Sequence, residues 1–248
     1  SNDINILKKK TSIFSSMLTP QGKFLYDFFI TNFNDQLYLE CNSKNTSEIL
    51  QKLNLYKLRS NVEFQVDKDL TIILTNENNS LKIKKISKNK SLDFFDPRFT
   101  NFFKRIYLKN KNFSEINENE DFQEINKKKY NEIRIENCIP DFMLDSFKNK
   151  SLLMEMRFDE LNGISWEKGC FMGQEITARM KYRNIIKKKL ISISIDFNSK
   201  LGAEIICNQK IIGSLLSHTN RYGIGYINTD FLIKENKDKI ICGDSVIK

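Results

Sequence analysis

The chain has 248 residues, of which 40% are hydrophobic and 29% are charged, a balance typical of a soluble globular protein and not of a disordered one. It contains no apolar run of about 18 residues, so we expect no membrane-spanning helix and no membrane partner. The net charge of +9 could mark a nucleic-acid surface, but the lysines are scattered in short runs, such as Lys8–Lys10 and Lys187–Lys189, which are usually solvated.

The five cysteines are an odd number without a C-x-x-C pair, which predicts reduced thiols and gives no zinc motif. They are Cys41, Cys138, Cys170, Cys207 and Cys242. With His218 as the only histidine, the chain has little from which to build a His-rich metal site or a Cys–His catalytic couple. The first residues also do not form a basic segment followed by an apolar one, so we expect a cytoplasmic protein.

The first third of the chain is predicted to form a pair of strands. Residues 24–30 and 36–41 are rich in aromatic and β-favouring side chains, with a turn at residues 32–35 between them. Two helices are predicted further along, at residues 45–56 with Thr46 or Ser47 as the cap and at residues 121–137. Short strands are predicted between these helices, at residues 62–66, 70–75 and 81–86.

Residues 164–183 stand out because Gly169 and Gly173, two of only nine glycines, lie four apart beside the only tryptophan, Trp166. Glycines this close to polar side chains usually mark a sharp bend or a close approach. If the segment is helical from about Cys170, two opposite faces result. One carries Met172, Ile176 and Met180, and the other carries Cys170, Gln174 and Lys181. The alternative is an ordinary buried helix in which Cys170 only packs.

After residue 183 the apolar pattern changes to a period of two. Residues 190–195 are Leu-Ile-Ser-Ile-Ser-Ile, in which isoleucine and serine alternate from residue 191 onward. Further strands are predicted at residues 203–207, 211–216, 223–227 and 239–242, joined by short turns. This pattern predicts a small all-β module at the carboxy-terminal end.

The segment from Lys168 to Arg179, Lys-Gly-Cys-Phe-Met-Gly-Gln-Glu-Ile-Thr-Ala-Arg, resembles the K-G-C-[FY]-x-G-Q-E-[IV]-x-A-R signature of the YgfZ-type folate-binding proteins. These proteins are relatives of the glycine-cleavage T-protein, an aminomethyltransferase. A match of this length is far more specific than a glycine pattern alone.

Three other segments support the resemblance. Residues 18–23, Leu-Thr-Pro-Gln-Gly-Lys, resemble the family's L-T-P-Q-G-[KR] turn, which in the T-protein precedes two adjacent carboxylates that include the catalytic acid. This chain has Tyr26-Asp27 there and lacks one acid. Asp96-Pro97-Arg98 with Arg105 resembles the family's D-P-R…R, although Asn101-Phe102-Phe103 replaces the usual Pro and Gly. Glu155 keeps the acid of the family's P-x-E-x-N.

The resemblance implies an α+β fold. Its parts would be a T-protein-like cloverleaf of two mixed α/β parts around a central channel and a small C-terminal β-barrel. The implied folate-binding domain is discontinuous and comprises residues 1–42 and 113–184. A second α/β domain, residues 43–112, would be inserted into it, and residues 185–248 would form the barrel.

The resemblance also implies tetrahydrofolate or a derivative as the cofactor. Such a ligand needs a carboxylate for the pterin's amino edge, apolar walls for the ring and cations for the glutamate tail. The residues assigned to it are Asp27, Lys168, Phe171, Gln174, Glu175, Arg179, Arg98 and Arg105. Taken singly, a charged residue is as readily a surface pair and an aromatic residue a core position. For Glu155, Trp166 and Arg221 we expect that structural role.

Cys170 is predicted to be a reactive thiol, because Gly169 and a helix start beside it would leave it reachable. Its role would be thiol chemistry or transient contact with an iron–sulfur species. No other cysteine lies within ligand spacing, so we expect neither a stable cluster nor another metal site in this chain.

The functional prediction has three forms. The resemblance implies a folate-binding accessory factor for iron–sulfur cluster assembly or maintenance, including tRNA-modifying enzymes, that acts without ordinary turnover. Its partners would be folate and iron–sulfur proteins or their assembly machinery, with an indirect link to tRNA. The alternative is a tetrahydrofolate-dependent aminomethyltransferase, and a weaker one is direct tRNA binding through the basic surface. The missing acid beside Asp27 and the presence of Cys170 both favour the first form.

Overall fold

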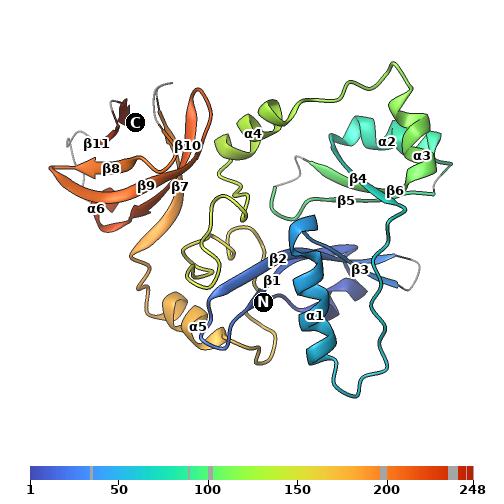
Figure 1. Ribbon diagram of the computed structural model, residues 1–248, viewed down its shortest axis with the longest axis horizontal. Coiled ribbons are helices and arrows are strands. Elements are labelled where there is room, and N and C mark those ends of the chain that lie inside the picture. The colour runs from blue at the N-terminus through green and yellow to red at the C-terminus, as the bar shows by residue number, and fades with distance from the viewer. Residues whose placement is uncertain are drawn as a thin grey trace. The chain divides into compact units, whose positions relative to one another are not determined.

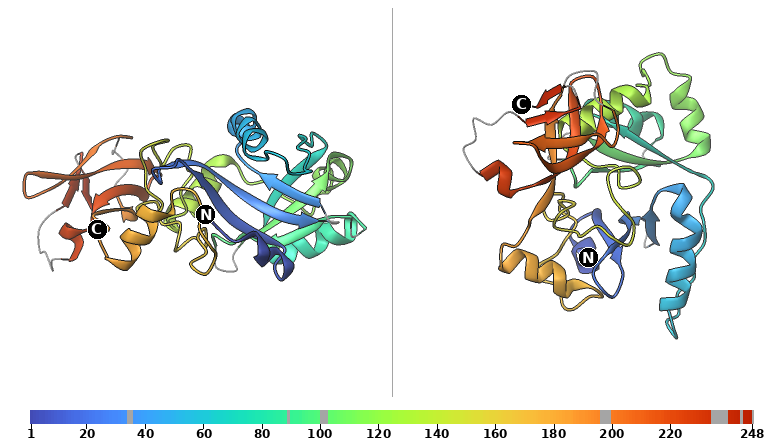
Figure 2. Two further views of the ribbon diagram at one scale, coloured as in Figure 1. Left: turned by 90° about the horizontal axis from the view of Figure 1, so that it is seen from below. Right: turned by 60° about the vertical axis from the view of Figure 1, so that its left-hand side comes forward.

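The computed structural model (Figure 1) describes residues 1–33, 36–88, 90–99, 103–195, 200–233, 240–243 and 245–247. The chain forms two compact units. Unit 1 comprises Ser1, Ser16–Leu25 and Ile125–Lys248, and unit 2 comprises Asn2–Ser15 and Tyr26–Glu124. Two strands, β1 (Ser12–Leu18) and β2 (Phe24–Phe33), each contribute residues to both units, and Figure 2 shows these strands in two further views.

Unit 2 contains two three-stranded sheets. The first has the order β1-β2-β3, where β3 is Gln36–Glu40 and pairs antiparallel with β2. The second has the order β4-β6-β5, from Leu70–Thr75, Lys104–Lys109 and Leu92–Phe95, and its pairs are also antiparallel. The helical elements are η1 (Ile4–Lys8), η2 (Ser43–Asn45), α1 (Thr46–Tyr56), α2 (Glu77–Ile86) and α3 (Asn110–Asn117).

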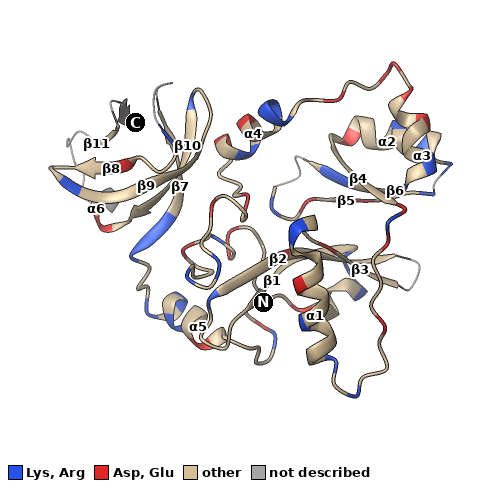
Figure 3. Cartoon of the chain, in the orientation of Figure 1, with Lys and Arg blue, Asp and Glu red and all other residues tan. Residues whose placement is uncertain are grey.

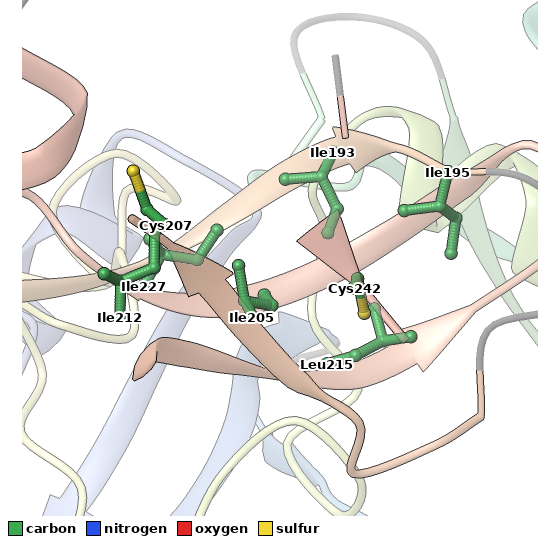
Figure 4. Packing of buried hydrophobic residues seen from close by; sticks show 8 residues of the cluster. All are labelled: Ile193, Ile195, Ile205, Cys207, Ile212, Leu215, Ile227 and Cys242. Carbon is green, nitrogen blue, oxygen red and sulfur yellow. The ribbon is translucent and has the colours of Figure 1, made fainter. Parts of the chain in front are cut away.

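Unit 1 ends in a six-stranded sheet with the order β12-β11-β8-β9-β10-β7. These strands are β7 (Lys188–Ser194), β8 (Glu204–Cys207), β9 (Lys210–His218), β10 (Tyr222–Asn228), β11 (Ile240–Cys242) and β12 (Ser245–Ile247). Its core consists of isoleucine, leucine and cysteine side chains that gather over one face of the sheet (Figure 4). The helices of unit 1 are α4 (Lys127–Glu136), α5 (Gln174–Tyr182) and the short α6 (Asp230–Ile233).

These elements confirm a mixed α and β fold with several antiparallel sheets. The strands predicted on either side of residues 34–35 form β2 and β3, and the predicted C-terminal strands form β7 to β11. The barrel, the cloverleaf and the three-domain boundaries stay predictions. Residues 34 and 35 of the predicted turn, Asn101 and Phe102 of the D-P-R…R loop, and Lys239 at the start of the last predicted strand lie outside the described residues.

The strand predicted at residues 81–86 is wrong, because these residues belong to α2. Alternation of apolar side chains with lysines imitates a strand there, yet Leu81 is exposed and only Ile83 and Ser80 are buried. The side chain of Asn76 caps the helix by accepting the Asn79 amide at 2.8 Å. Glu77 in the first turn and lysines in the last turn complement the helix dipole.

Three further predictions need correction. Residues 62–66 form no strand, and Val62 and Val66 are exposed there. The helix predicted at 121–137 begins only at Lys127, where Asn126 accepts the Lys129 amide at 2.9 Å, because Phe122 packs against the core of α2, α3 and β6 instead. The helix α1 does begin at Thr46, but Asn45 precedes it without a side-chain cap, and η2 leads into it.

The turn at residues 19–23 packs backbone against backbone on the loop that precedes α5. Gly22 has a φ of +75° and Gly173 a φ of +78°, both in the left-handed region. A Cβ on Gly173 would lie 2.5 Å from the Thr19 carbonyl oxygen, and a Cβ on Gly22 would lie 2.5 Å from the Gly173 carbonyl oxygen. The two segments that carry the family resemblance therefore meet at their glycines.

A buried ion-pair network joins the two sheets of unit 2. The Arg105 guanidinium on β6 donates to Asp96 at 2.8 Å and also pairs with Glu40 on β3. Tyr107 donates its hydroxyl hydrogen to Glu40 at 2.6 Å. Arg98 forms a two-point contact with Asp96, from Nε at 3.1 Å and from Nη2 at 2.9 Å. Two guanidinium charges are thus balanced by two carboxylates.

We expect Gly173→Ala to destabilise the protein by on the order of 3 kcal/mol, because left-handed backbone and the overlap with Thr19 both oppose a methyl group. Gly169→Ala is the matched control, since a Cβ there meets nothing within 4 Å, and it should change the free energy of unfolding by less than about 0.5 kcal/mol. Chemical denaturation of both variants measures this. Equal stabilities would contradict the packing argument.

We expect Asp96→Asn to destabilise unit 2 by roughly 3–5 kcal/mol, because Arg98 and Arg105 would lose a shared buried carboxylate. Burial by itself raises the pKa of Asp96, but the two guanidiniums outweigh it and the net pKa is lowered. The carboxylate therefore stabilises the fold above the ordinary aspartate pKa, and this stabilisation is lost as the pH falls through the lowered value.

Urea unfolding at neutral and acid pH tests this prediction. The variant should depend less on pH than the parent chain. Asp67→Asn is the control, because Asp67 pairs with Lys109 at an exposed position and its loss should have little effect. A variant at position 96 as stable as this control would show that the network contributes nothing.

Candidate functional site

The loop of residues 168–173 leads into α5 and is closed by Gln174. The Gln174 side-chain oxygen accepts the Phe171 amide at 3.2 Å, and the Gln174 amide donates to the Phe171 carbonyl at 3.2 Å. The helix begins at Gln174 because the left-handed Gly173 before it cannot be part of a helical turn. The predicted helix start at about Cys170 is therefore wrong, and Cys170 lies in the loop.

The faces of α5 differ from the predicted ones. Met180 and Thr177 are buried and Ile176 is half-buried, whereas Met172 lies before the helix and is 46% exposed. Cys170 does not share a helix face with Gln174 and Lys181, since it precedes the helix. The solvent side of the helix carries Glu175, Arg179 and Tyr182. Within the described part of the chain, neither Glu175 nor Arg179 takes part in a salt bridge.

Cys170 is exposed, whereas Cys41 is half-buried and Cys138, Cys207 and Cys242 are buried. The neighbouring Gly169 is also exposed, with open space around its α-carbon. The loop is fixed behind Cys170 by the Gly22–Gly173 contact and by Gln174. The end of the loop is therefore fixed. The thiol is accessible to solvent, as the neighbouring glycine predicted.

Cations and aromatic rings surround this loop. The Lys168 ammonium nitrogen lies 5.2 Å from the centroid of the half-buried Phe171 ring. The Lys181 ammonium nitrogen lies 3.7 Å from the Trp166 ring, and the Trp166 and Tyr182 rings meet edge to face at 6.4 Å. Trp166 therefore belongs to a cation–π cluster, which could not be predicted from the sequence because Trp166 is 15 or more positions from Lys181 and Tyr182.

Asp27 belongs to unit 2 and is half-buried on β2. Its charge acts on Cys41: burial raises the pKa of this thiol, and Asp27 and Glu40 raise it further. Tyr26, at the position where the resemblance implies a second acid, is buried and donates its hydroxyl hydrogen to Glu48 on α1. Tyr26 thus has a structural contact within unit 2.

The predicted site residues fall into two groups. Lys168, Cys170, Phe171, Gln174, Glu175 and Arg179 lie together on the loop and on α5 in unit 1. Asp27, Arg98 and Arg105 lie in unit 2, where the Arg98 and Arg105 guanidinium carbons lie 4.9 and 4.2 Å from the Phe29 ring centroid. Their assignment to one ligand stays a prediction.

Sequence reasoning missed Glu40 and Asp96 as partners of these arginines, and Tyr107 as a second donor to Glu40. Asp96 lies two residues before Arg98, which was an available signal. Glu40 lies on β3, in a different sheet from Arg105 on β6, so the packing of the two sheets had to be known. Glu155, as expected, has a structural contact, since it accepts the Tyr226 hydroxyl at 2.8 Å. That contact and burial raise the pKa of Tyr226, burial being the larger cause.

The described residues contain neither a candidate metal site nor a candidate membrane span. No group of three or more His, Cys, Asp or Glu side chains among them is arranged to hold a metal ion. Among the helices that they form, none is long and apolar enough to cross a membrane.

The chain is similar in sequence to mitochondrial iron–sulfur cluster assembly factors. No family model matches it. It is 24% identical over 208 residues to the IBA57 homolog of Mycosarcoma maydis, a match that covers 78% of this chain and 50% of the relative. It is 23% identical over 196 residues to IBA57 of Mus musculus, covering 74% of this chain and 53% of the relative. The chain thus spans about half the length of these relatives.

The names of these relatives overturn the expected cytoplasmic location, because both are mitochondrial proteins. The reduced thiols and the first residues, on which that expectation rested, do not distinguish the two compartments.

In structure, the chain is similar to the glycine cleavage system aminomethyltransferase T from Bartonella henselae. The TM-score is 0.74 at 12% sequence identity, and the match covers 96% of this chain and 74% of that one. The fold is therefore the T-protein fold. Together the comparisons confirm the resemblance to the YgfZ/T-protein-like family that the Lys168–Arg179 segment predicted.

Proposed function

We propose that this chain is a folate-binding accessory protein for the assembly or maintenance of iron–sulfur clusters, including those of tRNA-modifying enzymes. The observation that carries the proposal is the exposed Cys170 thiol on a loop fixed by glycine packing. Sequence similarity to iron–sulfur cluster assembly factors supports it. Its partners would be iron–sulfur proteins or their assembly machinery, with an indirect link to tRNA.

Cys170 would act as a transient ligand or nucleophile toward an iron–sulfur cluster carried by a partner. A thiolate is the ligand that cluster iron prefers. The remaining cysteines are buried or half-buried, so they are poorly placed to join Cys170 in holding a cluster. This arrangement suits temporary contact with a cluster as cargo.

The alternative, a tetrahydrofolate-dependent aminomethyltransferase, is supported only by the shared fold. Tyr26 argues against it, because its buried hydroxyl bonds to Glu48 where that enzyme has a second carboxylate. A phenol at this position cannot replace an acid that must ionise near neutral pH. We therefore place the assembly role first.

Folate binding is the second part of the proposal. A bound folate would supply a carrier of one-carbon units. Glu175 and Arg179 fit such a ligand because both are exposed and lack a salt bridge within the described residues, and Phe171 and Lys168 offer a ring and a cation. Gln174 completes the proposed set in unit 1, and a contact of Asp27 in unit 2 with the same ligand is not part of the proposal. Arg98 and Arg105 do not fit the role of tail-binding cations, since Asp96 and Glu40 already compensate their charges.

The finer fold description also belongs to the proposal. We infer a cloverleaf around a central channel, with a folate-binding domain of residues 1–42 and 113–184, an inserted domain of residues 43–112 and a β-barrel of residues 185–248. The match to the T-protein over almost the whole chain supports this division.

We expect Cys170→Ser to abolish rescue of iron–sulfur enzyme activity in a cell that lacks its own assembly factor. Because Cys170 is exposed, the melting temperature should stay unchanged. Cys41→Ser is the control and should still rescue, since that thiol is half-buried and its pKa is raised. Full rescue by the variant at position 170 would exclude the thiol role.

Alkylation of the native protein tests the same thiol directly. Mass spectrometry after mild iodoacetamide treatment should find Cys170 modified before the other four cysteines. Burial raises the pKa of Cys138, which slows it further. If Cys170 were the slowest, its role would be packing.

We expect reduced folate to bind with a dissociation constant between low micromolar and millimolar, roughly −8 to −4 kcal/mol. Glu175→Gln should weaken binding about tenfold or more, because a neutral amide accepts the pterin's hydrogens less strongly than a carboxylate. Glu167→Gln, which removes an exposed carboxylate outside the signature, should leave the affinity unchanged. Calorimetry with purified tetrahydrofolate measures all three, and equal affinities would remove Glu175 from the site.

A further inference from the structure

A strongly basic surface follows the Cys170 loop. It consists of the exposed residues Arg179, Lys181, Arg183, Lys187 and Lys188, on α5, on the segment after it and at the start of β7 (Figure 3). The sequence contains no Asp or Glu between Glu175 and Asp196. We call these five residues the basic surface.

The charge of the basic surface is largely uncompensated. Among the residues that the structure describes, Arg179, Arg183 and Lys187 have no acidic side chain within 4.0 Å, whereas the adjacent Lys189 is paired with Glu160. The buried arginines differ, since Arg105 and Arg134 are each paired with a buried carboxylate. Like charges held this close repel one another, so an acidic partner that approaches them gains electrostatic energy.

Apolar side chains lie exposed among these charges. Tyr182 is 73% exposed, Met172 46% and Ile185 44%. Lys181 is fixed by its contact with Trp166, which in turn meets Tyr182. Tyr, Trp and Arg are the residue types that dominate binding energy at protein interfaces. Because Trp166, Lys181 and Tyr182 already contact one another in the free chain, less side-chain entropy is lost when a partner binds.

We propose that the basic surface, with Tyr182, Met172 and Ile185, is the docking site for the acidic surface of an iron–sulfur protein. The inference rests on the proposed function, because α5 begins only four residues after Cys170 and docking there would bring the partner to the thiol. Charge complementarity sets the approach and the apolar side chains hold the partner in place.

The exposed residues favour a protein partner over a nucleic acid. Phosphate groups match the five cations equally well, but they offer nothing that buries the aliphatic Met172 and Ile185. A protein surface with an apolar centre and an acidic rim satisfies both kinds of side chain. Binding of tRNA through the same cations is the competing outcome that an experiment must separate.

Trp166 is the only tryptophan and provides a built-in reporter. The experiment titrates the full chain with a purified plant-type [2Fe–2S] ferredoxin chosen for its acidic surface and follows Trp166 fluorescence, with tRNA titrated in parallel. The test variant replaces Arg183, Lys187 and Lys188 by Glu. The control replaces Lys8, Lys9 and Lys10 by Glu, which are also exposed and change the net charge equally.

We expect ferredoxin binding to weaken at least tenfold in the test variant and as the salt concentration rises, and less than twofold in the control. Equal weakening in both variants, no ferredoxin binding, or binding of tRNA alone would overturn the proposal. Unchanged melting temperatures confirm that the variants are folded.

Cys170→Ser separates this inference from the proposed function. It should bind ferredoxin within twofold of the parent chain, because docking does not need the thiol. If docking fails while rescue still requires Cys170, the surface is wrong and the assembly role stands. If docking holds while Cys170→Ser still rescues, the surface stands and the thiol role fails.

Discussion

The contact between the backbones at Gly22 and Gly173 is the constraint on which the candidate site depends. Both residues occupy left-handed conformations, and neither has room for a Cβ. The contact therefore fixes the end of the Cys170 loop without using any side chain. Gln174 closes the same loop through the Phe171 backbone. Since the glycine backbones and one glutamine side chain hold the end of the loop, Lys168 and Cys170 are not needed for its closure.

Buried and exposed charges are used in opposite ways in this chain. Arg105 pairs with Asp96 and Glu40 in unit 2, and Arg134 pairs with Asp145 in unit 1, in both cases largely away from solvent. The arginines and lysines along α5 are exposed instead, and they are mostly unpaired among the described residues. A buried charge must be paired to avoid a large desolvation cost, whereas an exposed charge can stay unpaired at little cost. Burial, and not residue type, thus separates structural arginines from candidates for binding.

Much of the fold could be predicted from local patterns, because strands with aromatic or alternating side chains, such as β2, β3 and β7, have an unambiguous period. The helix α2 could not, since its apolar residues alternate with lysines and the cap at Asn76 decides the structure. For the site, Cys170 and its exposure were predicted from neighbouring glycines. The pairing of Arg105 with Glu40 was not, because β6 and β3 belong to different sheets and the contact depends on how these sheets pack.

The site supplies position more than chemistry. The single histidine, His218, lies at the end of β9 with Nδ1 3.3 Å from the Thr219 carbonyl oxygen, and the Tyr26 hydroxyl is engaged with Glu48. A thiol without acid–base partners is a weak catalyst on its own, yet it remains a good ligand for iron. Under the proposed function, the exposed thiol beside the basic surface would receive a partner's cluster for a short time, with the reacting groups brought by the partner.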